Sequence, residues 1–181
     1  MKLAKKLGLK TIVVDHHLPS GESPADVVVN PAQEGCPFQE YKLAAAGLVW
    51  MLLIVLRRRA AALVEQKKLI LKGAMPEPKD YLDLAVLGTV CDMVPLVGLN
   101  RVIASRGVEA IKRSVRPGIT ALKQVSGVST NPKFGAGHIA FNLGPRINAA
   151  GRLGDANDVI ELLTTEDSIQ AKTIAERIDR M

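Results

Sequence analysis

Cysteines, long apolar runs and repeats are scarce or absent in this 181-residue sequence. The two cysteines, Cys36 and Cys91, imply no disulfide framework, so a reducing cytoplasm is the expected location. The longest apolar run covers residues 44–56, whose 13 residues are fewer than a membrane-spanning helix needs. Residues 1–7 interleave lysine with apolar side chains, unlike the apolar segment of a signal peptide. The sequence therefore predicts a chain that makes no use of a membrane.

The overall composition is that of a globular protein. Hydrophobic residues make up 48% of the chain and charged residues 23%, which excludes a disordered tail and a collagen-like repeat. A chain of this length can bury a substantial core. The net charge of +6 is compatible with a polyanionic partner such as nucleic acid, although an ordinary basic protein explains it equally well.

Only two segments, both near the N-terminus, read as β-strands. Residues 11–14 and 27–29 are β-branched runs typical of buried parallel strands. Apolar spacing, proline and glycine predict helices for the rest, over residues 2–7, 41–63, 81–93, 100–114, 117–125, 145–150, 156–163 and 168–181. We predict an α/β fold, with a partial doubly wound parallel sheet followed by a mostly helical segment. Because two strands are too few to support so many helices, the pattern also predicts an internal piece of a larger protein.

The sharpest local motif is Asp15-His16-His17, directly after the first strand. In open α/β sheets, ligands bind beyond the carboxyl ends of the strands. A carboxylate and two imidazoles at that place suit a divalent transition metal. The alternative is an ordinary loop whose polar side chains bond to their own backbone.

A second candidate is Asp92, near the end of a predicted apolar helix. A negative charge at a helix C-terminus is unfavourable without a nearby cation, and a buried carboxylate needs a partner. The alternative is that Asp92 reaches the surface as the helix ends.

The third candidate is the segment 144–156, which combines glycines with Arg146, Asn148 and Arg152. Arginine forks match phosphate oxygens, and glycines let backbone amides approach an anion. We expect this segment to be a turn with a short helix, with Asp155 as the N-cap of the next helix.

Other polar residues give weaker signals. The basic runs 57–59 and 67–68 are most simply solvated residues that follow a long helix. His138 is isolated and is expected to be structural. Cys91 could bind a soft metal but has no partner cysteine, and Cys36 is expected to be inert.

Together, three motifs in this order resemble the DHH phosphoesterase superfamily, and within it the RecJ-type single-stranded-DNA-specific exonucleases. The motifs are Val13–His17, Leu87–Leu96 followed by Asn100-Arg101, and Gly144–Ala156, with Asn30-Pro31 and Gly35–Phe38 between them. The resemblance implies hydrolysis of phosphodiester bonds with two divalent ions, Mn or Mg. It also implies cleavage of single-stranded DNA from the 5′ end in cytoplasmic repair and recombination, with other repair proteins as partners.

The same resemblance assigns roles to the candidates. Asp15, His16, His17 and Asp92 become the catalytic set. Of these, His16 and Asp92 are expected to ligate metal, Asp15 to ligate or to orient His16, and His17 to contact the phosphate. Arg152 is expected to bind a backbone phosphate, with Arg146 and Asn148 in support.

Departures from the family pattern concern what flanks these motifs. The resemblance implies further acidic motifs before Asp15, which supply most of the metal ligands, and a substrate-binding domain after residue 181. Residues 1–126 then correspond to the C-terminal part of the DHH domain, and 127–181 to a helical connector. Cys91 stands where alanine is usual. We expect this chain to bind metal weakly, to cleave slowly or not at all, and to self-associate through its exposed sheet.

Two alternatives remain open. One is a phosphoesterase of the same superfamily that acts on a small substrate, such as an oligonucleotide, a cyclic dinucleotide or pyrophosphate. The other is a DNA-binding scaffold without catalysis, although both histidines and Asp92 are intact.

Overall fold

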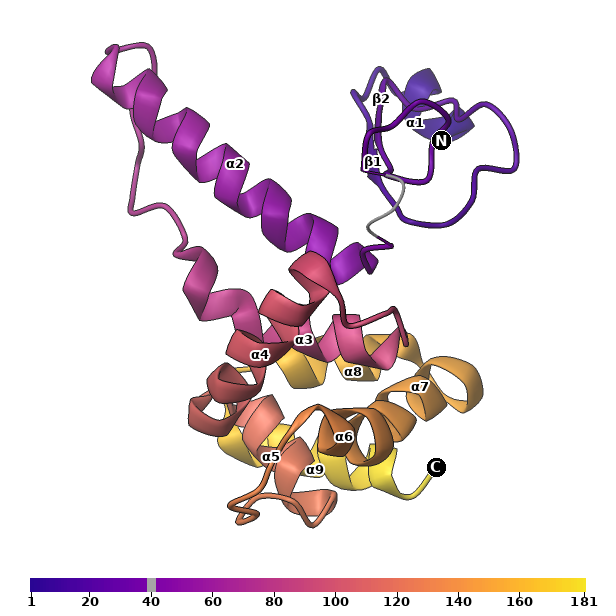
Figure 1. Cartoon of the computed structure of the whole chain (residues 1–181), viewed down its shortest axis with the longest axis vertical. Helices are drawn as coiled ribbons and strands as arrows, with labels where there is room; N and C mark the ends of the chain where they lie inside the picture. Colours follow the sequence, from indigo (N-terminus) through magenta and orange to yellow (C-terminus); the bar gives the residue numbers. More distant parts are fainter. Residues whose placement is uncertain (39–41) are drawn as a thin grey trace.

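The computed structural model describes residues 1–38 and 42–181. It consists of a small N-terminal lobe, a long helix and a body of packed helices (Figure 1). The lobe lies beside the start of the long helix, which projects away from the body, and the C-terminus lies at the opposite end of the body from the lobe.

The N-terminal lobe contains helix α1 (Lys2–Lys6) and two strands, β1 (Ile12–Val14) and β2 (Val27–Val29). Helix α1 stops before Gly8, whose positive φ of 69° favours glycine. The strands pair in parallel, with Val13 opposite Val28. This confirms the α/β class with a parallel sheet. Both strands end at the same edge, so the residues that follow β1 and β2 are neighbours.

Hydrophobic burial in this lobe is slight. Ile12 is 67% exposed and Val27 is 49% exposed, although both belong to strands. Among the described residues before Lys42, Asn30 alone is buried, and it is polar. The lobe is therefore held by backbone pairing and polar contacts more than by an apolar core.

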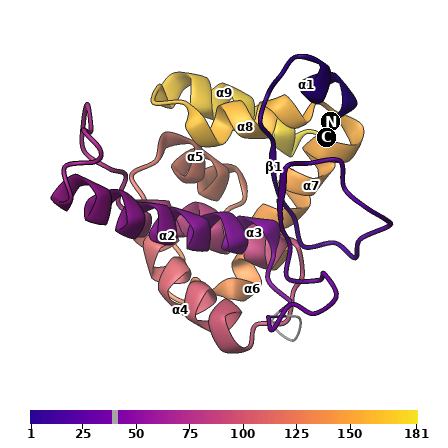
Figure 2. The ribbon, with the colours of Figure 1, turned by 90° about the horizontal axis from the view of Figure 1, so that it is seen from above.

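The long helix is α2 (Ala45–Glu65). Seen from above, it crosses over α3 (Leu82–Cys91) (Figure 2). The indole N–H of Trp50 donates to the carbonyl of Pro78 at 2.7 Å. Near the far end, Arg57 donates to the Met75 carbonyl at 2.7 Å and pairs with Glu77. These bonds fix the returning connector against the helix.

The body is built from the remaining helices around α3. They are η1 (Pro78–Tyr81), α4 (Gly98–Arg113), α5 (Pro117–Val125), α6 (Ala136–His138), the π-helical turn η2 (Ile139–Leu143), α7 (Gly144–Leu153), α8 (Ala156–Thr164) and α9 (Ser168–Asp179). Helix α3 is apolar on most sides, and Val86 is fully buried. Gly88 lets α2 approach through Ala46, and Gly107 lets α4 approach Val86. Small residues thus allow α2, α3 and α4 to pack closely.

One hydrophobic core runs through the body from Ala85 to Ile178. The expected boundary at residues 126/127 crosses this core, because α5 packs on both α8 and α9. Gly118 in α5 lies directly against the backbone of Leu162 in α8.

Most predicted helices are confirmed, with shifted ends. The long helix begins at Ala45 rather than at Tyr41, and Tyr41 lies outside the described residues. The short helix expected within 144–156 is present but longer than predicted, and the non-helical part is limited to residues 154 and 155. Residues 144–153 form one continuous helix, which follows η2 directly, because Ala150 is buried in the core and Ile147 packs against it. Asp155 caps α8 by accepting from the backbone of Asn157, as predicted.

Within the described ranges 1–38 and 42–181, no helix combines the length and apolar character that crossing a bilayer requires.

The close contact at Gly118 predicts a steric limit. A Cβ at this position would overlap the Leu162 carbonyl oxygen, which is backbone and cannot move aside easily. We expect Gly118→Ala to lower the free energy of unfolding by about 2 kcal/mol or more, measured by urea denaturation. Gly137→Ala is the matched control, because a Cβ there meets no atom within 4 Å. Equal stability of the two variants would contradict the packing described here.

Candidate metal and phosphate site

The loop after β1 is organised by the carboxylate of Asp15. Its Oδ1 accepts from the backbone N–H of His16 at 2.7 Å and lies 2.7 Å from Nδ1 of His17. These hydrogen bonds, that of the His17 side chain first, hold the pKa of Asp15 below its ordinary value. Asp15 is thus a preformed anion that fixes the orientation of His17.

The three side chains form a compact set of donors. Ligand atoms of Asp15, His16 and His17 lie within 4.8 Å of one another. The two imidazole rings are 4.3 Å apart between centroids and are tilted by 48°. His16 is largely buried, with 19% of its side chain exposed, whereas His17 is 76% exposed. His16 therefore faces the protein and His17 faces solvent.

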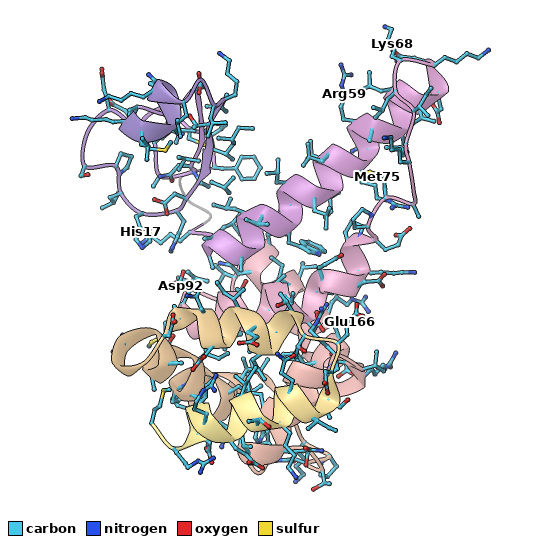
Figure 3. All side chains as sticks on the ribbon, turned by 180° about the vertical axis from the view of Figure 1, so that it is seen from behind. His17, Arg59, Lys68, Met75, Asp92 and Glu166 are labelled. Carbon is cyan, nitrogen blue, oxygen red and sulfur yellow. The ribbon has the colours of Figure 1, made fainter. Side chains whose placement is uncertain are left out.

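Asp92 meets this set from the helical body. It is the C-terminal cap of α3, and its Oδ2 lies 3.3 Å from Nε2 of His16. Figure 3 shows His17 at the lower edge of the N-terminal lobe, with Asp92 across from it on the body. The side chain of Asp92 is 39% exposed, so it does reach the surface as α3 ends. It nevertheless has a partner, and the contact joins the two parts of the molecule.

Asn30 is a positioning residue that the sequence did not single out for a role. It follows β2, is only 7% exposed, and donates from Nδ2 to the His17 carbonyl at 2.8 Å. Its Oδ1 accepts from the backbone of Ala32 at 2.8 Å. Asn30 thereby links the two loops that leave the parallel strands. Its place after the second strand, at the same sheet edge as Asp15, was the signal that could have identified it.

Helix α7 begins beside the end of α3. Gly144 lies against Cys91, the residue before Asp92. Asn148 stands one turn further along this face of α7, and Arg152 a second turn. Both are exposed, and neither has a polar partner in the part of the chain that the structure describes.

Arg146 differs from these two. Its Nε donates to Asp179 at 2.6 Å, and Nη1 donates to the carbonyl of Asn142 at 2.7 Å. These bonds tie α7 to α9 and to η2. Arg146 therefore stabilises the helix that carries Asn148 and Arg152. Because 144–153 is helical, Gly151 forms no separate amide cradle, contrary to the expectation from its sequence.

Comparison with known proteins shows what the chain is similar to. Residues 1–89 match the DHH family, N-terminal domain. The chain is 37% identical to the single-stranded-DNA-specific exonuclease RecJ of Bacillus subtilis, and the alignment covers 99% of this chain and 21% of the relative. It is 36% identical to the RecJ of Escherichia coli, over 98% of this chain and 31% of the relative.

Solved structures show the same similarity. A crystal structure of exonuclease RecJ bound to manganese matches with a TM-score of 0.79 and 34% identity, over 99% of this chain and 42% of that chain. A Thermus thermophilus RecJ in complex with Mn²⁺ matches with a TM-score of 0.80, over 99% of this chain and 25% of that one. The resemblance to RecJ-type proteins is thus confirmed along nearly the whole chain, which spans less than a third of the curated relatives named here.

The other polar residues considered in the sequence lie away from Asp92 and His16 or have a structural role. Figure 3 places Arg59 and Lys68 at the far end of α2, away from Asp92. His138 caps its own turn: the Gly135 N–H donates to Nδ1 at 3.1 Å, and Asn131 lies 2.9 Å from Nε2. His138 is therefore structural.

Cys91 is an unreactive neighbour of the site. Burial raises the pKa of its thiol to about 11, and the adjacent Asp92 carboxylate adds to the shift. The thiol therefore stays protonated near neutral pH, whereas a metal ligand would be a thiolate.

This raised pKa predicts slow alkylation of Cys91. In a Cys36→Ala variant, we expect iodoacetamide at pH 8 to modify Cys91 on the order of a hundredfold more slowly in the folded chain than in urea. Mass spectrometry after timed quenching measures both rates. Cys91→Ala in the same background controls for modification of other groups. Similar rates in the two states would show that the thiol is neither buried nor held neutral.

Proposed function

We propose that this chain carries part of the active site of a metal-dependent phosphodiesterase that removes nucleotides from the 5′ end of single-stranded DNA. The observation that carries the proposal is the contact between His16 after β1 and Asp92 after α3. Two elements 76 positions apart (92 − 16) bring an imidazole and a carboxylate together, beside the anionic Asp15. Relatives that match nearly the whole chain are named single-stranded-DNA-specific exonuclease RecJ.

The donor set fits divalent Mn or Mg. Carboxylate and imidazole are suitable ligands for Mn²⁺, and carboxylate suits Mg²⁺. We assign His16 and Asp92 as ligands. Asp15 acts through its hydrogen bonds, because Oδ1 already accepts from both histidines' backbone and from the His17 ring. When bound, two such ions activate water and offset charge on the phosphate. RecJ structures of this fold hold Mn²⁺ or Mg²⁺.

We assign the exposed residues of the site to substrate binding. His17 is oriented by Asp15 and is open to solvent, so it can donate to a phosphate oxygen. Arg152 and Asn148 supply unpaired donors along α7, at about 12 Å and 6 Å from its start at Gly144, taking 1.5 Å per residue. Successive phosphates of one strand can be bound along such a helix face. Arg146 supports them through Asp179.

The ligand count limits what these residues do on their own. Two six-coordinate ions need more protein ligands than His16, Asp92 and Asp15 offer. We therefore infer weak metal binding and slow or no cleavage by this chain by itself. The apolar strand residues exposed on the lobe, such as Ile12 and Val27, support self-association. Cytoplasmic repair and recombination, with other repair proteins as partners, are inferred from the RecJ resemblance.

Different results in these tests would indicate one of two other functions. A small-substrate phosphoesterase would cleave a dinucleotide faster than a long 5′-phosphorylated strand, although the open face of α7 favours the longer substrate. A scaffold would bind single-stranded DNA equally well with and without metal, although the intact His16–Asp92 contact favours catalysis.

Metal binding tests the site directly. We expect this chain to bind Mn²⁺ more weakly than about 100 µM, a free energy near 5.5 kcal/mol, and Asp92→Asn and His16→Gln to lose that binding. Water-proton relaxation measures Mn²⁺ binding, and nucleotide release from 5′-phosphorylated single-stranded DNA measures activity. Glu22→Gln, an exposed change in the same lobe, is the control. Micromolar binding of two ions per chain, or cleavage that Asp92→Asn abolishes, would contradict the inferred need for further ligands.

Measurements of single-stranded-DNA binding and of stability distinguish the roles of Arg146 and Arg152. We expect Arg152→Gln to weaken binding and to lower the slope of log K against log salt by about 0.7, for one lost phosphate contact. Its stability should stay unchanged, because its side chain has no polar partner among the described residues. Arg146→Gln should instead lower the stability by about 1 kcal/mol. An unchanged salt slope in the Arg152 variant would show that Arg152 does not contact the DNA.

A further inference from the structure

The positive charge of the chain is concentrated in one segment. Residues 57–72 contain six arginines and lysines and a single acidic residue, Glu65, so they carry +5 of the net charge of +6. The rest of the chain is therefore close to neutral. We call residues 57–72, which comprise the last turns of α2 and the turn and connector that follow it, the basic tip.

The basic tip lies far from His16 and Asp92. Helix α2 begins next to the N-terminal lobe and carries the tip away from the body (Figure 1). Figure 3 shows Arg59 and Lys68 at the far end of this helix, away from Asp92. The 21 residues of α2 span about 30 Å at 1.5 Å per residue. The tip is therefore too distant to contact a phosphate bound at His16 and Asp92.

The backbone of the tip has a defined geometry. The N–H of Lys67 donates to the Val64 carbonyl at 2.9 Å. The N–H of Lys68 donates to the Leu63 carbonyl at 2.8 Å, and such a pair of bonds closes a helix in the Schellman arrangement. The bonds of Arg57 described above fasten the returning connector to the helix. The cations of the tip are therefore presented on a well-ordered turn.

Lys67 occupies the position in this turn that glycine usually fills. Its φ is 55°, a left-handed conformation that is unfavourable for a residue with a side chain. Folding alone would therefore favour glycine at this position. Because strained residues are common at functional sites, the side chain of Lys67 indicates a role other than folding.

Five cations of the tip are available to a partner. Of the six, Arg57 is engaged with Glu77. The others are exposed and form no ion pair with any residue in the ranges 1–38 and 42–181, and they are Arg58, Arg59, Lys67, Lys68 and Lys72.

We propose that the basic tip binds the phosphate backbone of double-stranded DNA, as an interaction surface separate from the metal and phosphate site. Five free cations on a projecting turn match a duplex, which carries one negative charge per about 1.7 Å of its length. Proteins that bind single strands add aromatic side chains on which bases stack, and residues 57–72 contain none. A segment that lies on a membrane needs an apolar face, whereas Ile70 is the only large apolar residue within 57–72 that is more than half exposed.

Duplex binding without metal tests this surface. The probe is a fluorescent blunt duplex of about 20 base pairs, which is longer than α2 at about 3.4 Å per pair. Its binding to the whole chain is followed by anisotropy in EDTA at several salt concentrations. We expect the double variant Arg58→Gln/Arg59→Gln to lower the slope of log K against log salt by about 1.8, at about 0.9 per lost phosphate contact. The matched control Arg106→Gln/Lys133→Gln removes the same charge from exposed positions on the body and should leave the slope unchanged.

Lys67 allows a test in which stability and binding change in opposite directions. We expect Lys67→Gly to raise the urea midpoint, because glycine adopts a positive φ readily. The same variant should lower the salt slope for the duplex by about 0.9. Lys67→Arg keeps the charge and should keep the slope. Circular dichroism checks that each variant is folded.

Three outcomes would overturn the proposal. Equal salt slopes for the tip variant and the body control would show that the duplex does not use the basic tip. A loss in the tip variant that is confined to a single strand of the same length, or to vesicles of phosphatidylserine and phosphatidylcholine, would assign the tip to another partner. Because the duplex is measured in EDTA, the result does not depend on the metal site, and failure of the proposed function would appear only in the Mn²⁺ measurements described above.

Discussion

The packing of α3 inside the helical body determines where the site lies. Val86 of this helix is completely buried, and Gly88 and Gly107 let α2 and α4 lie close to it. This packing fixes the position of α3 in the body, and Asp92 is the residue that caps its C-terminal end. The start of α7 is held at the same place by the contact of Gly144 with Cys91. One buried helix therefore places both the carboxylate and the surface that carries Asn148 and Arg152.

The lobe that carries Asp15 and His16 is held by different forces. Its strands leave apolar side chains in water, so hydrophobic burial stabilises it little. Polar bonds fix the loops instead: Asn30 joins the loops after β1 and β2, and Asp15 binds its own following residues. Such bonds are directional. They therefore determine the orientation of side chains, while each contributes only modestly to the free energy of folding.

Local patterns in the sequence predicted the parts of this structure that depend on local physics. The β-branched runs, Gly8 and Asp155 each act through nearby backbone, and the two strands, the helix end and the cap appear where those residues predict them. The position of Asp92 opposite His16 came from the family resemblance, because no local rule relates the ends of β1 and α3. The glycines of 144–156 led to the expectation of a turn for the same reason. Glycine permits a turn, but burial of Leu143 and Ala150 in the shared core makes the segment a helix.

The body is well packed, whereas the lobe buries few apolar side chains, and this difference affects ligand binding. His16 belongs to the lobe and Asp92 to the body, so any ligand that contacts both also joins the two parts. By mass action, such a ligand stabilises the arrangement in which it binds best. A cavity beside these residues is shared in the same way, since its walls come from loops of both parts. On the proposed function, binding of metal and binding of phosphate are therefore coupled through this joint, because each stabilises the arrangement that the other requires.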